Sequence, residues 1–134
     1  MTTPQISTDG PWSTVSVVIP TYDRSALLER AVRSCLAQTC PVHEVLVCAA
    51  GSTDGSEERV RALGDPRVKW LPGTHAGRPA IPRNRGIAAA EGEWVAFLDS
   101  DDAWLPQKLA TQLERLSLAG LEASCTNAER VGPT

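Results

Sequence analysis

Three aspartates lie within four positions near the end of the chain. Asp99, Asp101 and Asp102 follow directly on an apolar run, residues 94–98. Crowded carboxylates repel one another unless positive charge lies among them. At the carboxyl edge of a strand in an open α/β sheet, where ligands bind, a hard divalent cation carrying phosphates supplies that charge. The alternative is an acidic turn that is only solvated.

The elements that must position these acids alternate between strand and helix. β-Branched or apolar runs predict the strands, and leucine or alanine repeats at helical spacing predict the helices. The expected strands are residues 15–19, 44–48, 67–71, 94–98 and 121–126. The expected helices run from Ser25 to Gln38, from a capping box at Asp54 and Glu57 to Gly64, from Pro82 or Arg83 to Ala90, and along Leu105, Leu109, Leu113 and Leu116. This order predicts an α/β fold with a mainly parallel sheet and helices on both faces.

Size and charge narrow the function classes. The 134 residues suffice for one domain, and the net charge of −3 with no basic block argues against nucleic-acid binding. No apolar run approaches the roughly 20 residues that span a bilayer. Residues 1–12 are expected to form a flexible leader without the features of a secretory signal, and residues 13–134 the domain. A cytoplasmic location is the expectation.

The four cysteines are not spaced like a metal or redox motif. Cys35, Cys40, Cys48 and Cys125 include no C-x-x-C pair. Three of them fall in apolar positions of expected helices or strands. Buried reduced thiols are therefore expected, with disulfides or a zinc site as the alternative.

Four sequence blocks together resemble the inverting glycosyltransferases of family 2, which have the GT-A fold. The blocks are VSVVIPTYDR at 15–24, GSTDGS at 51–56, RNRGI at 83–87, and FLDSDD at 97–102 with WLP at 104–106. Each block alone is weak, and their shared order and spacing make the resemblance specific. The resemblance covers the chain from about Val15 onwards.

The resemblance implies a site for a nucleotide diphosphate sugar and a Mg²⁺ or Mn²⁺ ion. Asp99 and Asp101 match the ends of the family's D-x-D motif, and the ion is expected at Asp101 and Asp102. A metal on the pyrophosphate would stabilise the negative charge of the departing group. A UDP-sugar is the default donor, and the acceptor is unknown. The residues expected to bind the nucleotide sugar are Pro20, Thr21, Tyr22, Arg83, Asp99, Ser100 and Asp101.

Two departures from the family pattern bear on function. Ala49 and Ala50 stand where family members carry an acidic pair, one member of which accepts the N3–H of uracil. Losing a charge-assisted acceptor costs about 1.5–3 kcal/mol. The acceptor-binding half and the catalytic base follow the D-x-D region by many tens of residues in the family. Glu122 and Glu129 do not match that base, so no catalytic residue is assigned.

Other functional classes stay open at this point. The same pocket could belong to a catalytically incomplete binding or regulatory module, which the two alanines and the short chain favour. A nucleotidyltransferase would need a glycine-rich basic loop after the first strand, and a Rossmann dinucleotide enzyme would need G-x-G-x-x-G; neither is present. A sheet lacking its second half exposes apolar surface, so self-association or a covering partner chain is expected.

Overall fold

The computed structural model describes residues 14–21, 25–49, 51, 55–73 and 80–120. In this part of the chain, strands and helices alternate. The strands are β1 (Val15–Thr21), β2 (Glu44–Ala49), β3 (Val68–Leu71) and β4 (Trp94–Phe97). The helices are α1 (Ser25–Leu36), α2 (Ser56–Arg61), α3 (Ala80–Ala89) and α4 (Lys108–Ala119). None of these helices combines the length and apolar character that a membrane crossing requires.

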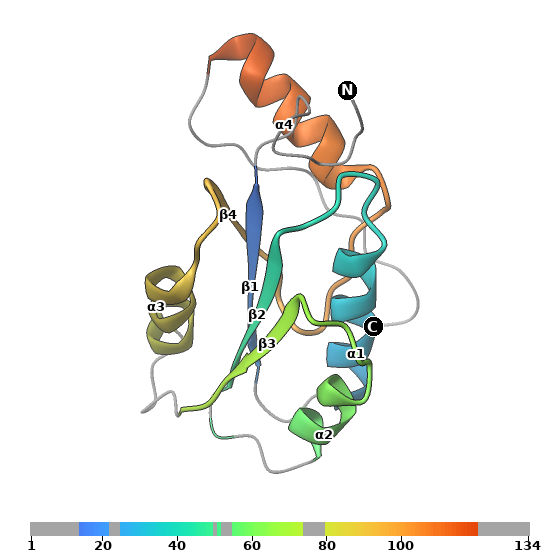
Figure 1. The fold of residues 1–134 in the computed structure, drawn as a ribbon, viewed down its shortest axis with the longest axis vertical. Coiled ribbons are helices and arrows are strands. Elements are labelled where there is room, and N and C mark those ends of the chain that lie inside the picture. The colour runs from blue at the N-terminus through green and yellow to red at the C-terminus, as the bar shows by residue number, and fades with distance from the viewer. Residues whose placement is uncertain (1–13, 22–24, 50, 52–54, 74–79, 121–134) are drawn as a thin grey trace.

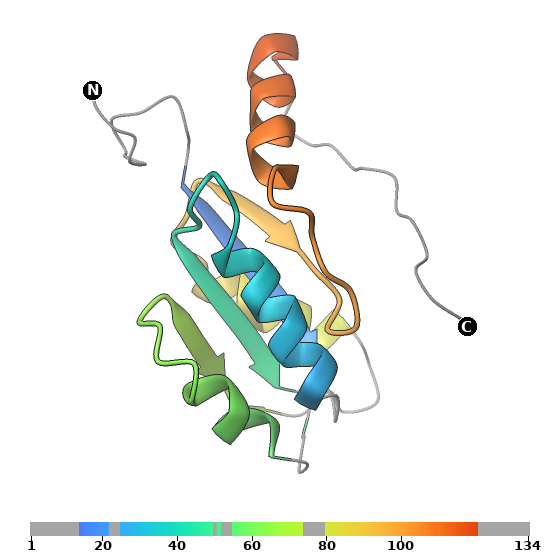
Figure 2. The same ribbon diagram turned by 90° about the vertical axis from the view of Figure 1, so that its right-hand side faces the viewer.

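The strands form one parallel sheet with helices on both faces, which confirms the predicted fold class. Their order is β3-β2-β1-β4, and each neighbouring pair is parallel. Helices α1 and α2 cover one face and α3 covers the other (Figure 1). Figure 2 shows α4 extending beyond the end of α1, past the sheet.

Successive side chains of β1 pack on opposite faces of the sheet and so join both helical layers to it. Val15, Val17 and Ile19 join the main core with α1, whereas Val18 packs with Leu46 and others on the α3 face. Successive side chains of a strand point to opposite faces, and both faces here are covered. A strand buried on both sides therefore reads as the continuous apolar run seen in the sequence.

Strand β1 runs two residues further than predicted. The sequence indicated a stop at Pro20, but Pro20 pairs with Cys48 and Thr21 pairs with Ala49. The carbonyl of Val18 accepts a hydrogen bond from the Leu98 N–H on the β4 side, so by alternation the backbone of Pro20 also faces that side. The β1–β4 pairing ends at Val18, and the missing N–H of Pro20 costs the β2 ladder nothing.

Two helices begin elsewhere than expected. Helix α3 begins at Ala80, before Pro82, because a proline in the first turn removes only an N–H that has no intrahelical partner. Helix α4 begins at Lys108, so the prediction that Leu105 belongs to its buried face is wrong: Leu105 is 77% exposed. Leu109, Leu113 and Leu116 are buried as predicted. The expected last strand lies outside the described residues.

Three of the cysteines can be located. Cys35, Cys40 and Cys48 are free and buried, as predicted. Burial raises the pKa of Cys35 to about 12 and that of Cys48 to about 11. Thiols held so far from ionisation are poor nucleophiles and metal ligands. Cys125 lies outside the described residues.

Helix α3 approaches the sheet at Gly86. A Cβ atom at this position would lie 2.5 Å from a methyl group of Val18 and 2.8 Å from Cys48 Sγ. Both distances are shorter than real contacts allow, so only glycine permits this spacing of α3 against β1 and β2. The close approach fixes the position of the helix that carries Arg83.

We expect Gly86→Ala to lower the free energy of unfolding by about 1–3 kcal/mol, the usual cost of overpacking. In an exposed helix the same change stabilises, because alanine is the better helix former. Urea unfolding of this variant and of Asn84→Ala, an exposed position on the same helix, measures the difference. Equal or greater stability of Gly86→Ala would contradict the close approach.

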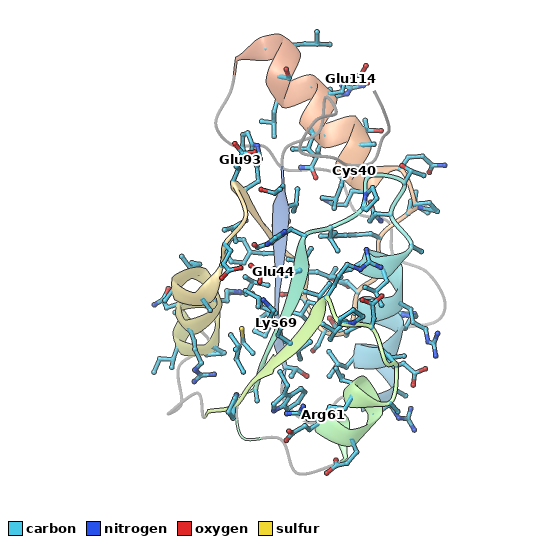
Figure 3. The ribbon with its side chains drawn as sticks, in the orientation of Figure 1. Cys40, Glu44, Arg61, Lys69, Glu93 and Glu114 are labelled. Carbon is cyan, nitrogen blue, oxygen red and sulfur yellow. The ribbon has the colours of Figure 1, made fainter. Side chains whose placement is uncertain are left out.

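A buried carboxylate ties the other end of the sheet together. Glu44 is 1% exposed and accepts hydrogen bonds from Ser16 Oγ at 2.6 Å, Lys69 Nζ at 2.9 Å and the Glu91 N–H at 2.7 Å. Figure 3 labels Glu44 on β2 and Lys69 on neighbouring β3. Burial alone would raise the pKa of Glu44, but the hydrogen bonds and the Lys69 charge outweigh it and lower the pKa below 4.5.

We expect Glu44→Gln to lower the free energy of unfolding by about 1–3 kcal/mol, because the neutral amide pairs less well with Lys69 and the two donors. A folded-state pKa below the unfolded one stabilises the fold above the unfolded pKa, and this contribution is lost as the pH falls through the folded pKa. The stability difference between wild type and variant should therefore be constant at neutral pH and shrink below about pH 4.5.

Denaturant titrations between pH 3 and pH 8 measure this dependence. Glu114→Gln is the matched control, since Glu114 is an exposed carboxylate on α4. A stability difference that did not change with pH would rule out the charged network as its cause.

Candidate functional site

Residues 99–102, which we call the acidic segment, follow β4 at the point where the strand order reverses. From β1 the chain continues to β2 and β3 on one side, whereas β4 pairs with β1 on the other side. In open parallel sheets ligands bind outside the carboxyl ends of the strands at such a reversal. The Leu98 N–H donates to the Val18 carbonyl at 3.1 Å, so the chain enters the acidic segment alongside the end of β1.

The three predicted acids converge. Asp99, Asp101 and Asp102 are exposed, and each offers a carboxylate oxygen within 4.8 Å of those of the other two. A turn closes the segment, in which the Asp102 N–H donates to the Asp99 carbonyl at 3.0 Å. Partial burial and the neighbouring charges of Asp101 and Asp99 raise the pKa of Asp102. The cluster therefore concentrates negative charge beyond the end of β4.

Two arginines from different helices contact this segment. Arg83 Nη2 of α3 lies 3.0 Å from Asp99 Oδ1, in an ion pair whose side chains are 43% and 57% exposed. Arg30 Nη2 of α1 donates to the Asp101 carbonyl at 2.7 Å. Because Arg30 binds the backbone, the Asp101 carboxylate is left facing the cluster. The charge of Arg30 also lowers the pKa of Asp102, against the larger effects that raise it.

The other predicted site residues differ in their position and burial. Pro20 and Thr21 end β1, at the carboxyl edge of the sheet. Thr21 is 3% exposed, and its Oγ1 has no hydrogen-bond partner among the described residues. Ser100 is buried at 7% exposure, in contrast to the exposed aspartates on either side. Tyr22 lies outside the described residues.

Sequence reasoning did not single out Arg30. The only local signal is its place on the exposed face of an amphipathic helix, where an arginine is ordinary. Its partner Asp101 is 71 positions away along the chain. Only the packing of α1 beside the acidic segment reveals the contact.

Arg85, a member of the RNRGI block, connects α3 to the sheet. Its Nη1 donates to the Ala49 carbonyl at 2.7 Å, which links α3 to the end of β2. Its guanidinium also occupies the space beside Gly73, where a Cβ would lie 2.3 Å from it. The Ala49 side chain itself is 4% exposed, so this edge of the sheet presents backbone and a guanidinium where the family has carboxylates.

Solved structures share this fold. The structure of residues 1–349 of S. aureus TarS in complex with UDP superposes with a TM-score of 0.72 at 27% identity, over 90% of this chain and 38% of that one. The mannosyltransferase PcManGT from Pyrobaculum calidifontis, in complex with GDP-Man and Mn²⁺, gives a TM-score of 0.70 at 29% identity, over 78% of this chain and 32% of that one.

Sequence relatives point the same way. The succinoglycan biosynthesis protein ExoO of Rhizobium meliloti is 37% identical over 87% of this chain and 34% of its own length. The Escherichia coli β-1,3-glucosyltransferase WfgD is 35% identical over 76% of this chain and 40% of its own length. The chain thus spans about a third to two fifths of these relatives.

A family model settles the classification. The model described as "Glycosyl transferase family 2" matches residues 16–133, which is nearly the whole chain. It includes all four sequence blocks apart from Val15, and every residue of the acidic segment. The chain belongs to glycosyltransferase family 2 and has the GT-A fold.

Proposed function

We propose that the chain is the donor-binding part of a metal-dependent glycosyltransferase. It would bind a nucleotide diphosphate sugar, from which the sugar passes to an acceptor hydroxyl with inversion and release of a nucleoside diphosphate. The observation that carries the proposal is the convergence of three carboxylates within 4.8 Å at the strand-order reversal. Family membership supports the same chemistry.

The donor set fits a hard divalent cation. Carboxylate oxygens are the ligands that Mg²⁺ and Mn²⁺ favour, and no thiol or imidazole accompanies them in the described cluster. We assign the ion to Asp101 and Asp102, with Asp99 and Ser100 beside the nucleotide. When bound, the cation would stabilise the negative charge that develops on the pyrophosphate as the sugar departs.

The chain's own residues would orient the nucleotide around this ion. Arg83, now 3.0 Å from Asp99, is a donor suited to bidentate pairing with a phosphate. Pro20, Thr21 and Tyr22 would line the base and ribose pocket. The buried hydroxyl of Thr21, which has no partner among the described residues, supports this, because such a group costs free energy unless water or a ligand completes its hydrogen bond.

The base of the bound nucleotide differs among the similar structures. TarS binds UDP and UDP-GlcNAc, and PcManGT binds GDP-Man. We infer a UDP-sugar, as is usual in the family. Ala49 offers no carboxylate to the base, so we expect base recognition through backbone groups and weaker discrimination between UDP and GDP.

A second function is favoured by that same alanine. The chain could hold a nucleotide sugar without transferring it, as a binding or regulatory module. Its acceptor-facing partner would then be another part of a longer protein, a second copy, or a different chain. In an incubation with a UDP-sugar and Mn²⁺, release of UDP supports transfer chemistry, whereas binding without release points to a module or to a fragment of an enzyme.

The metal site predicts cation-dependent nucleotide binding. Titration of UDP or GDP by calorimetry should give an affinity that rises with Mn²⁺. Asp101→Ala and Asp102→Ala should each weaken it by more than about tenfold, a loss that even outer-sphere partners of a metal produce. Glu114→Ala, which removes an exposed carboxylate elsewhere, should leave it unchanged. Nucleotide affinity that is independent of Mn²⁺ would refute the proposal.

An ion site without its ion should weaken the fold. Asp102→Asn removes one of three repelling charges, so we expect it to raise the free energy of unfolding by a few tenths to about 1 kcal/mol at low salt. The effect is small because solvent screens exposed charges, and added salt should reduce it further. Thermal unfolding at two salt concentrations, without divalent ions, measures the change.

Asp65→Asn provides a control of opposite sign. Hydrogen bonds from Arg67, at 3.0 Å from its Nη2, lower the pKa of Asp65, so neutralising this carboxylate should destabilise the protein. If both substitutions destabilised equally, repulsion would not outweigh attraction at Asp102.

A further inference from the structure

Three polar side chains on α1 or just after it bind the backbone of the acidic segment and of the residues that follow it. Arg30 and Ser34 lie on α1 and Gln38 lies just beyond its end, at intervals of four residues that place them in one row. We call these three residues the α1 clamp. Residues 101–109 run along this row in the same direction as the helix (Figure 1).

Each member of the α1 clamp binds a different backbone group. Arg30 donates to the Asp101 carbonyl at 2.7 Å, and Ser34 Oγ accepts from the Trp104 N–H at 3.1 Å. Gln38 Nε2 donates to the Leu105 carbonyl at 2.8 Å, and its Oε1 accepts from the Leu109 N–H at 3.0 Å. The aspartate carboxylates take no part in these bonds.

Gln38 also supplies a cap that α4 lacks. The residue before α4, Gln107, makes no capping hydrogen bond with its side chain. Leu109 is the second residue of the helix, and its N–H is one of those that have no intrahelical acceptor. Gln38 satisfies this group from another element. With an exposure of 5%, it has no solvent to replace these bonds if they are lost.

The geometry points to Gln38 as a positioning residue for the acidic cluster, acting with Ser34 and Arg30. Asp99, Asp101 and Asp102 repel one another, so their convergence needs a scaffold that opposes separation. The described contacts give one: Arg83 holds the near end of the segment through Asp99, and the α1 clamp holds the far end. This inference rests on the proposed function, because it assumes that the cluster binds the metal and nucleotide.

Gln38→Met tests the inference, since methionine keeps the length of the side chain and removes both hydrogen-bonding groups. We expect about tenfold weaker Mn²⁺ affinity in the presence of UDP, the scale of loss typical of residues that orient metal ligands. Calorimetry, or the Mn²⁺ electron paramagnetic resonance signal of the free ion, measures binding without reference to activity. Ser34→Ala, which removes one bond, should give a smaller loss in the same direction.

A matched variant separates positioning from stability. Val60→Ala truncates a buried side chain of α2, which contacts β3 and α1, and it removes none of the hydrogen bonds of the α1 clamp. It should lower the melting temperature as Gln38→Met does, yet keep the Mn²⁺ affinity of wild type at a temperature where all variants are folded. Equal loss of Mn²⁺ affinity in both variants would overturn the positioning role.

The outcomes distinguish this inference from the proposed function. If the wild type binds UDP without Mn²⁺ dependence, the proposed function fails and the inference fails with it. If the wild type is Mn²⁺-dependent and Gln38→Met binds equally tightly, only the inference is overturned. Should Gln38→Met not fold, Ser34→Ala decides, and unchanged Mn²⁺ affinity in that variant overturns the role.

Discussion

Repulsion among three carboxylates is the constraint on which the rest of this structure depends. Asp99, Asp101 and Asp102 bring carboxylate oxygens within 4.8 Å of one another, although Arg83 forms an ion pair with Asp99. Like charges this close favour separation, so the surrounding elements must hold the segment in place. Arginines from opposite faces of the sheet, Arg30 and Arg83, meet the segment from two sides.

The packing of α3 and of the strands positions the elements that carry these two arginines. Gly86 lets α3 approach β1 and β2, and this approach sets how far Arg83 reaches. The buried network around Glu44 joins β1, β2, β3 and the chain after α3 at the opposite edge of the sheet. The Glu44 network thus holds the sheet together at the amino ends of its strands, while the exposed acids lie at the carboxyl ends.

Much of this organisation could be predicted from local patterns. β-Branched runs identified the strands, and the D-x-D segment was recognised because its residues are neighbours in the chain. The sequence does not reveal the contacts of Arg30, Gln38 and Arg85. Their partners lie 36 to 71 positions away, and nothing in the local sequence distinguishes these residues from other polar residues on or near a helix. Leu105 was misassigned because its apolar spacing matches α4, although the proline after it delays the helix until Lys108.

The cap that Gln38 gives to α4 couples two remote parts of the chain during folding. A 12-residue helix is marginal on its own, and this one takes its N-terminal acceptor from a residue 71 positions earlier. Helix α4 should therefore gain its full order only after α1 has docked on the sheet. Chain collapse around the first two strands would come first, and the C-terminal helix of the described region would assemble last.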